Sequence, residues 1–273
     1  MKTYRRVMTI AGSDPSGGAG IQADIKTISA LGCFATSAIV AVVDENTVGV
    51  TGVYPVPAEF VSGQIRSILD DIGTDAVKIG MLHSSELIRS VRATLDCYPD
   101  IRDIVLDPVM VATSGDPLLE KDAVETLSSV LVNRARVITP NIPEAELLLG
   151  SKIEFQDQLP DAARELSKLG SSVLLKAGHL TDNELIDIFY NLETDEILHL
   201  KSRRIDTVNT HGTGCTLSSA FASFLARGCS LNNAARNAKD YIAGAIEAGA
   251  QYKIGHGHGP VCHFFKSLLE SDC

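Results

Sequence analysis

The run Asn209-Thr210-His211-Gly212-Thr213-Gly214-Cys215-Thr216 combines glycines, hydroxyls and a thiol at the expected start of a helix. Ala, Phe and Leu recur after it, and Gly228 can end the helix. Glycines let the backbone approach a ligand, and the first turn of a helix offers unpaired N–H groups with a partial positive charge. The run is therefore typical of an anion site, for which a transferred phosphoryl group is a candidate. A structural turn before a core helix explains it equally well.

Two carboxylates and a lysine follow strands that the sequence predicts to be buried. Asp107 ends one apolar run, and Glu144 follows the next predicted strand behind Asn141 and Pro143. Asp107 and Glu144 could bind Mg²⁺ through their oxygens, or they could only cap a turn and a helix. Lys176 ends another buried strand, where it must meet an anion, either a phosphate or a salt-bridge partner. Because both carboxylates are expected at one edge of the sheet, near the anion site, we favour a magnesium–nucleotide site over two separate caps.

Cys215 allows different kinds of chemistry. A cysteine in the first turn of a helix has a lowered pKa, so Cys215 could be the nucleophile of a cysteine hydrolase or transferase with His211 as base. Alternatively, its backbone N–H and thiol could line a pocket for a phosphoryl group. It could also be a small packing residue.

Other motifs are absent or weak. The chain has no GxxxxGK[ST] and no strand-linked GxGxxG, so neither a Walker-type NTPase nor a dinucleotide-binding protein is supported. His256 and His258, with Cys262 and His263 nearby, fit no common zinc spacing, and the glycines around them predict a turn. The phosphate site must therefore be the Gly212–Gly214 turn.

Apolar runs and helical patterns alternate from one end of the chain to the other. Near-continuous apolar strands joined by helices predict a mostly parallel, doubly wound sheet with helices on both faces. Three successive strands late in the chain predict an antiparallel edge, so the expected fold class is three-layer α/β. The expected strands are Val7–Ala11, Thr36–Val43, Ala76–Met81, Asp103–Met110, Arg136–Pro140, Ser172–Gly178, Leu185–Asn191 and Ile197–Ile205. The expected helices are Ile21–Leu31, Pro57–Asp70, Ser85–Asp96, Lys121–Leu131, Glu144–Leu149, Leu159–Lys168, Thr216–Arg227 and Leu231–Ala250.

Seven polar or glycine-rich segments lie just past the carboxyl ends of these strands. In an open parallel sheet, ligands bind at that edge, so the shared location is a stronger signal than any one segment. The segments are Asp14–Gly20, Asp44–Thr47, Met81–Ser84, Asp107–Asp116, Thr139–Glu144, Lys176–His179 and Asn209–Cys215.

Composition and charge limit the expected partners. The 273 residues are 45% hydrophobic and carry a net charge of −10, which predicts no nucleic-acid partner, and no apolar run approaches membrane-spanning length. Six cysteines without a CxxC pair favour free thiols, and no signal peptide is recognised, so the cytoplasm is expected. No linker or internal repeat divides the chain, so we expect one domain over residues 1–273.

Seven motifs keep a common order along the chain: Ala11–Asp24, Lys78–Leu82, Asp107–Met110, Ser114–Leu118, Thr139–Ala145, Asn209–Thr216 and Gly259–Val261. In these motifs the sequence resembles the hydroxymethylpyrimidine/phosphomethylpyrimidine kinases of the ribokinase-like superfamily. The resemblance covers nearly the whole chain.

The resemblance implies an enzyme of thiamine biosynthesis that uses ATP and Mg²⁺. Its substrates would be 4-amino-5-hydroxymethyl-2-methylpyrimidine, which is phosphorylated on the hydroxymethyl group, and then the monophosphate, which becomes the diphosphate. It also implies one ribokinase-like domain without a large lid, and a homodimer. A pyridoxine/pyridoxal kinase on the same scaffold is the alternative. A catalytically idle nucleotide-binding regulator is disfavoured by the complete set of site residues.

Site residues of the family carry over to matching positions. The resemblance implies that Gly214 and Cys215 form the anion hole, that Asp107 and Glu144 organise Mg²⁺, and that Lys176 meets the ATP phosphates. The expected catalytic set is Gly212, Gly214, Cys215 and Lys176, and the expected nucleotide contacts are Asn141, Thr210, Gly212, Thr213 and Lys176. The substrate pocket is expected to use Gly12, Asp24, Glu45, Met81 and Val109.

Two positions depart from related patterns. Many ribokinase-like sugar kinases have an aspartate base where this chain has Cys215, a cysteine that the pyrimidine kinases share, so the base stays open. The family usually has glutamine at Glu45. An ionised glutamate offers only acceptors, so it would pair well with a ring nitrogen only if a proton lies between them. Alternatively, Glu45 could turn to solvent or cap the turn at Asn46.

Overall fold

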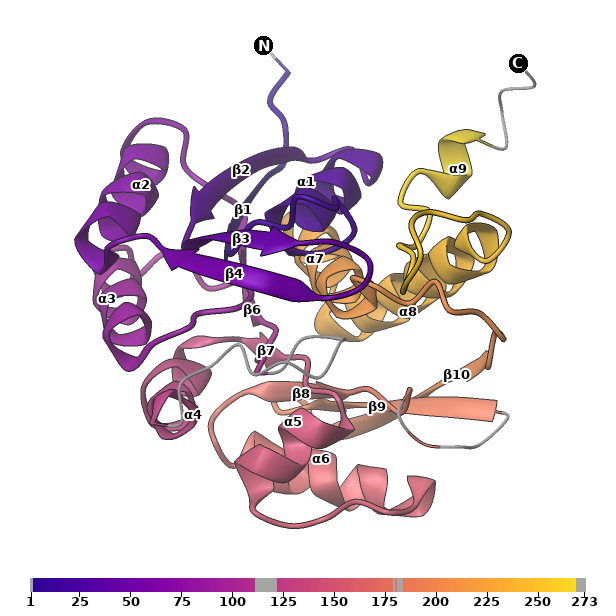
Figure 1. The fold of residues 1–273 in the computed structure, drawn as a ribbon. Coiled ribbons are helices and arrows are strands. Elements are labelled where there is room, and N and C mark those ends of the chain that lie inside the picture. Colours follow the sequence, from indigo (N-terminus) through magenta and orange to yellow (C-terminus); the bar gives the residue numbers. More distant parts are fainter. Residues whose placement is uncertain (1, 111–121, 179, 181–183, 269–273) are drawn as a thin grey trace.

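A large twisted sheet forms the centre of the computed structural model, which describes residues 2–110, 122–178, 180 and 184–268 (Figure 1). Within these residues its strands are β1 (Arg6–Ala11), β2 (Phe34–Ile39), β5 (Ala76–Ile79), β6 (Ile104–Leu106), β7 (Val137–Ile138), β8 (Ser172–Leu175), β9 (Glu184–Asn191) and β10 (Glu196–Arg203). They lie in the order β10-β9-β8-β7-β6-β5-β1-β2. Strands β8, β7, β6, β5, β1 and β2 pair in parallel, whereas β9 pairs antiparallel with both neighbours. The predicted parallel sheet with an antiparallel edge is confirmed.

The central strands are apolar because both of their faces are covered. Every residue of β5, β6, β7 and β8 is buried, including the polar Lys78 and Ser172. Alternate side chains enter two separate hydrophobic cores, so Val77 faces one core and Ala76 the other. A strand buried on both faces shows no alternation of polar and apolar residues, which is why the sequence pattern identified these strands correctly.

Helices on one face of the sheet enclose the first core, in which Ile65 of α2 and Leu87 of α3 are buried. Helix α3 begins where the Ser84 side chain accepts a hydrogen bond from the Leu87 N–H, which satisfies an otherwise unpaired donor. The elements of this layer are α2 (Ala58–Asp71), α3 (Ser85–Asp96), α4 (Ala123–Thr126), a π turn (Leu127–Leu131), a 3₁₀ turn (Val132–Arg134), α5 (Ile142–Leu149), a second 3₁₀ turn (Gln156–Gln158) and α6 (Leu159–Ser167).

Helices on the opposite face enclose the second core. The ring of Phe221 packs on Phe189 of β9 at 5.7 Å between centroids. Residues 216–226 are all buried, because this segment lies between the sheet and a neighbouring helix. The helices of this layer are α1 (Gly20–Ala30), α7 (Thr213–Ala226), α8 (Leu231–Gly249) and the short α9 (Phe265–Leu268).

The predicted strand Thr36–Val43 is in fact two strands. β2 ends at Ile39, and the chain then leaves the large sheet through Val40, whose N–H bonds Ala11 O and whose C=O accepts from Val56. Beyond it, β3 (Ala41–Glu45) pairs with β4 (Val50–Pro55) in a small antiparallel sheet separate from the large one (Figure 1). The apolar pattern continues through Val40, so it carries no sign of this change of partner.

The other differences are local. The helix expected over Lys121–Leu131 is a short α-helix that widens into the π turn, and Lys121 lies outside the described residues. The motif Ser114–Leu118 and His179 also lie outside them. No helix within the described part of the chain is long and apolar enough to cross a membrane. The five described cysteines are free thiols, as expected.

Candidate active site

A cavity of about 650 Å³ opens where the parallel strands end. All seven of the predicted polar segments contribute residues to its wall. The small β3–β4 sheet contributes Val43 and Glu45, so one wall comes from an element that the sequence did not predict. The cavity extends from this small sheet, past the start of α7, to α8 and the antiparallel edge strands.

The start of α7 forms the central part of the wall. Gly212 is its N-cap, with a left-handed φ of 78°, and a side chain at this position would overlap the carbonyl oxygen of Gly18. A methyl group on Gly214 would lie 3.3 Å from Asp107 Oδ2 and 3.3 Å from Lys176 Nζ. The backbone of the first helical turn therefore lies directly against a charged pair. Thr210, Thr213 and Cys215 line the cavity beside these glycines.

Asp107, Glu144 and Lys176 meet at one side of this helix start. Lys176 Nζ lies 3.1 Å from Asp107 Oδ1 and 4.0 Å from Glu144 Oε2. Burial raises the pKa of Glu144 to about 7; Lys176 opposes this rise and Asp107 adds to it. Burial disfavours the charge of Lys176, but the two carboxylates outweigh burial and raise its pKa. One lysine therefore offsets the two buried acids only in part.

These acids fit a divalent cation. Asp107 Oδ1 accepts from Thr139 Oγ1 at 2.8 Å and from Lys176, while Oδ2 faces the helix start. Carboxylate oxygens are the donors that Mg²⁺ prefers, and an added cation would favour the ionised form of Glu144. The helix-capping interpretation also holds, because Asn141 and Glu144 form a reciprocal capping box at the start of α5. The two roles are compatible.

The Cys215 thiol does not have the lowered pKa that a helix start can produce. Burial raises its pKa to about 11, against the opposing effect of nearby Lys78. His211, the base considered for it, directs Nε2 to Asp14 Oδ2 at 2.8 Å instead. The interpretation of Cys215 as an activated nucleophile in a cysteine hydrolase is therefore contradicted.

Four of the five expected substrate residues line the cavity: Gly12, Glu45, Met81 and Val109. A methyl group on Gly12 would lie 2.8 Å from Met81 Cε, so these two segments touch at the cavity wall. Glu45 is mostly buried, with Oε1 3.9 Å from His211 Nε2, and does not extend into solvent as one interpretation allowed.

Asp24 is the exception, and the expectation that it lines the pocket is wrong. It lies on the inner side of α1 with no exposed surface, and both of its carboxylate oxygens are 2.9 Å from Lys78 Nζ. Thr9 and Ser219 also donate hydrogen bonds to it. Lys78 is the member of this pair that reaches the cavity wall. A charge on a buried strand was the available signal for Lys78, but only the tertiary structure gives its partner.

The sequence also missed the apolar end of the cavity. Helix α8 and the edge strands supply apolar side chains to the wall, and the same elements also contribute the charged Asp187, Arg203 and Lys239. The helical pattern indicated that α8 is partly buried, but not that part of its apolar face borders a cavity. The apolar residues of this end are Leu185, Ile205, Ile242, Ala243 and Ile246.

The His256–His258 segment is a turn, as expected. The backbone N–H groups of His256 and His258 donate to Thr47 Oγ1 and Thr47 O. Gly255 and Gly257 lie so close to Thr47 that a side chain at either would overlap it. Within the described part of the chain, the group of ligand-type side chains close enough to share a metal ion is Asp14, Glu45 and His211, and this turn is not part of it.

Comparison with known proteins agrees with this arrangement. The family model described as phosphomethylpyrimidine kinase matches residues 14–262. The chain belongs to this family. A hydroxymethylpyrimidine/phosphomethylpyrimidine kinase of Escherichia coli is 43% identical over 259 residues, which cover 94% of this chain and 96% of that protein. A bifunctional thiamine biosynthesis protein of Geobacter sulfurreducens is 45% identical over 94% of this chain, which spans only 52% of that longer relative.

Solved structures of kinases with this ribokinase-like fold resemble the chain closely. An ADP complex of Bacillus subtilis pyridoxal kinase has a TM-score of 0.88 and 33% identity, and covers 97% of this chain and 100% of its own. A phosphomethylpyrimidine kinase from Clostridium difficile has a TM-score of 0.76 and 40% identity, with coverage of 87% and 97%. Of these two structures, the pyridoxal kinase has the higher TM-score with this chain, and the phosphomethylpyrimidine kinase has the higher sequence identity.

Proposed function

We propose that this chain transfers a phosphoryl group from MgATP to 4-amino-5-hydroxymethyl-2-methylpyrimidine, and then phosphorylates the monophosphate to the diphosphate. One observation carries the proposal: a helix start made of glycines lies between a buried lysine–carboxylate cluster and an enclosed substrate end of the same cavity. Phosphoryl transfer requires the two reactants to meet in line at a site that stabilises negative charge. The cavity brings these requirements together.

The helix start stabilises the charge of the transferred group. The N–H groups of Gly214 and Cys215 lie at the positive end of α7, and Lys176 adds a permanent cation beside them. Gly212 keeps the turn in its left-handed conformation. Asp107 and Glu144 would hold Mg²⁺, which, when bound, supplies further positive charge to the phosphate oxygens.

ATP occupies the other side of this helix start. Asn141, Thr210, Thr213 and Lys176 border its phosphates, and the apolar end between α8 and the edge strands is suited to a flat purine base. The ADP complex of the Bacillus subtilis pyridoxal kinase, which has the same fold, supports the use of an adenine nucleotide. The pyrimidine lies opposite, between Gly12, Met81, Val109 and Glu45.

Cys215 contributes through its backbone N–H and its neutral thiol. With a pKa of about 11, the thiol is a poor base near neutral pH. A loose transition state for phosphoryl transfer needs little deprotonation of the attacking hydroxyl before bond formation, so positioning and charge stabilisation provide most of the rate. This function does not require a covalent intermediate on Cys215.

Residues 1–273 act as one kinase domain in this proposal. The family resemblance supports a homodimer, and the net charge of −10 argues against a nucleic-acid partner. The free thiols of the described cysteines are compatible with the cytoplasm. Light scattering of the purified protein tests the homodimer.

A pyridoxine/pyridoxal kinase is the second candidate, because the Bacillus subtilis pyridoxal kinase has the higher structural similarity of the two structures compared. Phosphorus NMR with MgATP and a panel of the aminopyrimidine, its monophosphate and B6 vitamers separates the two. The proposal expects the diphosphate of the pyrimidine as the final product. Turnover restricted to B6 vitamers would replace it with the second candidate, and ATP consumption independent of any added alcohol would contradict both.

A further inference from the structure

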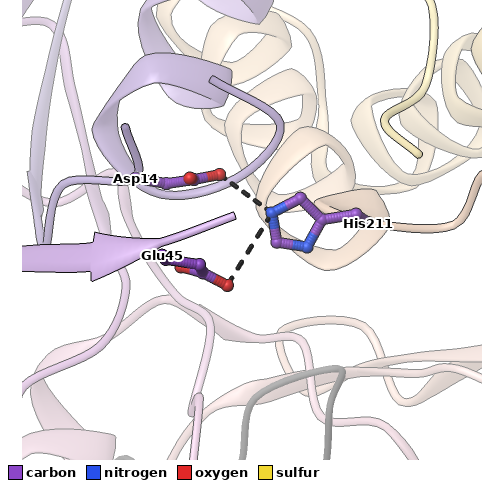
Figure 2. A group of neighbouring side chains, drawn as sticks. All are labelled: Asp14, Glu45 and His211. Atoms are coloured by element: carbon purple, nitrogen blue, oxygen red, sulfur yellow. Dashed lines mark hydrogen bonds and ion pairs between the residues drawn. The ribbon is translucent and has the colours of Figure 1, made fainter. Parts of the chain in front are cut away.

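His211 joins two segments that are far apart in the sequence (Figure 2). Its Nε2 atom lies 2.8 Å from Asp14 Oδ2 and 3.9 Å from Glu45 Oε1. Asp14 belongs to the loop after β1, and Glu45 is the last residue of β3. The three side chains are buried or mostly buried and line the substrate end of the cavity.

The hydrogen bonds of Asp14 fix the protonation of the facing His211 nitrogen. Asp14 Oδ2 accepts from the N–H groups of Gly18 at 3.0 Å and Ala19 at 2.6 Å, and from Ser16 Oγ at 2.9 Å, while Oδ1 accepts from the Ser16 N–H at 2.7 Å. These donors hold the pKa of Asp14 well below its usual range despite its burial, with the largest lowering effect from His211. An ionised Asp14 is an acceptor, so His211 Nε2 must carry the proton.

The charges around the ring favour the doubly protonated imidazolium. Among the described residues, the charged groups that act on His211 are Asp14 from the loop after β1 and Glu45 from β3; Pro260, from the loop beyond α8, is uncharged. Burial opposes the charge of the ring, but the two carboxylates outweigh it and raise the pKa of His211. A cation at 3.9 Å in turn favours the ionised form of a neighbouring carboxyl group.

We propose that His211 is a positioning residue that holds the Glu45 carboxylate ionised and oriented at the cavity wall. The class of ligand that this arrangement selects is a heteroaromatic alcohol whose ring edge presents hydrogen-bond donors, such as an amino group beside a protonated ring nitrogen. The inference rests on the proposed function and deepens it, since it places His211 behind Glu45, the side chain that contacts the substrate ring. The glutamine usual in the family needs no cation beside it.

Close packing keeps the imidazole in place. A side chain on Gly18 would overlap the His211 ring, so the loop after β1 covers one side of it. His211 also pairs with Pro260 in an isolated bridge, and its N–H donates to Gly259 O at 3.0 Å. Because Gly212 follows directly in the chain, the residue that orients Glu45 is bonded to the turn at which the phosphoryl group is transferred.

A divalent metal is the other possible occupant of this group of ligand-type residues. The structure argues against it, because Asp14 Oδ2 already accepts four hydrogen bonds and His211 Nε2 carries a proton directed at it. A metal would have to displace that proton and the backbone donors. Isothermal titration with Zn²⁺ tests this point, and micromolar binding that His211→Gln abolishes would overturn the proposal.

A double-mutant cycle tests the coupling between His211 and Glu45. His211→Gln should raise KM for the aminopyrimidine roughly tenfold, as expected for loss of a charge-assisted interaction, with a smaller change in kcat. The same substitution in a Glu45→Gln background should change KM by about twofold or less, since a neutral amide needs no cation. His258→Gln is the matched control, because this histidine is exposed outside the cavity, and KM should not change. An equal KM penalty in both backgrounds would show a merely structural role.

A second measurement does not depend on catalysis. Proton–nitrogen NMR of the histidine rings in the complete protein should show an imidazolium at His211 with a pKa above the ordinary 6.5, and Glu45→Gln should lower that pKa. His258→Gln should leave it unchanged. If the wild type fails to phosphorylate the aminopyrimidine but shows this titration, the proposed function fails and the inferred pairing stands. A His211 titration that Glu45→Gln does not alter would overturn the inference.

Discussion

Two clusters in the cavity contain the same kinds of charge, two carboxylates and one cation. At the transfer end, Lys176 lies 3.1 Å from Asp107 and 4.0 Å from Glu144. At the recognition end, His211 lies 2.8 Å from Asp14 and 3.9 Å from Glu45. The distances are nearly the same, yet the two clusters are suited to different tasks.

The difference lies in the hydrogen bonds that the carboxylates already accept. Asp14 receives three backbone N–H groups and the imidazole, so it has little capacity left for a ligand. Asp107 Oδ1 accepts from Thr139 and Lys176, while Oδ2 faces the helix start and accepts only a long hydrogen bond of 3.5 Å from Ser218 Oγ. A carboxylate saturated by backbone donors anchors its neighbours, whereas one with remaining lone pairs can bind a cation. The local donors, and not the residue types, separate a structural anchor from a ligand site.

The largest expected effect comes from neutralising the transfer end. Asp107→Asn and Glu144→Gln should lower kcat by ~10–100-fold and raise the Mg²⁺ concentration needed for half-maximal rate, because each removes a charged oxygen from the cation site. KM for the pyrimidine should change little. Steady-state kinetics over a Mg²⁺ series measures both quantities. If both variants show the same Mg²⁺ dependence as the wild type, the two carboxylates only cap a turn and a helix.

Cys215→Ala should have an effect of similar or smaller size at the same end. Loss of one oxyanion donor costs ~10²–10³ in kcat, but the backbone N–H survives this substitution, so the loss should be at the lower limit or below it. Mass spectrometry of the enzyme during turnover should detect no phosphocysteine and no thioester. A stable adduct on Cys215 would contradict the proposed mechanism of direct transfer.

Glu45→Gln should alter recognition and leave transfer nearly intact. A charge-assisted hydrogen bond contributes ~1.5–3 kcal/mol, roughly a tenfold to hundredfold change in affinity. Wild-type KM for the aminopyrimidine should rise with pH, because the complex holds a proton between Glu45 and the ring, and this rise should flatten in the variant. The pH dependence of KM and the preference between pyrimidine and pyridoxine are measured together. If wild type and variant have the same pH dependence of KM and the same preference between pyrimidine and pyridoxine, Glu45 is not part of the substrate site.

The smallest expected effect is on stability. The pKa of His211 is raised on folding, so its pairing stabilises the fold fully below the unfolded value of 6.5 and this contribution is lost as pH rises through the folded pKa. Asp14, with a lowered pKa, contributes constantly at neutral and alkaline pH. The free energy of unfolding of the wild type should therefore exceed that of His211→Gln by on the order of 1 kcal/mol at acidic to neutral pH. The difference should be smaller at alkaline pH. Urea unfolding across this range measures the difference, and a gap independent of pH would contradict the pairing.

The sequence by itself determined the sheet and the edge at which the site forms. Strands such as Ile104–Leu106 are apolar throughout because helices cover both faces, and that pattern needs no knowledge of their neighbours. The parallel arrangement then directs every segment that follows a strand to one edge. Gly212, Gly214, Asp107 and Lys176 could therefore be assigned to one cavity from local patterns alone.

Tertiary structure decided which charges meet and which reach the cavity. Asp24 and Lys78 are separated by 53 intervening residues, and only the packing of α1 on β1, the neighbour of β5, pairs them and leaves Asp24 beneath the wall. The division of Thr36–Val43 at Val40 depends on hydrogen bonds to Ala11 and Val56, which the apolar pattern does not encode. His211 has Asp14 and Glu45 as neighbours because two loops and the end of β3 converge. A local pattern reports burial and periodicity, whereas the partner of a buried charge is set by long-range packing.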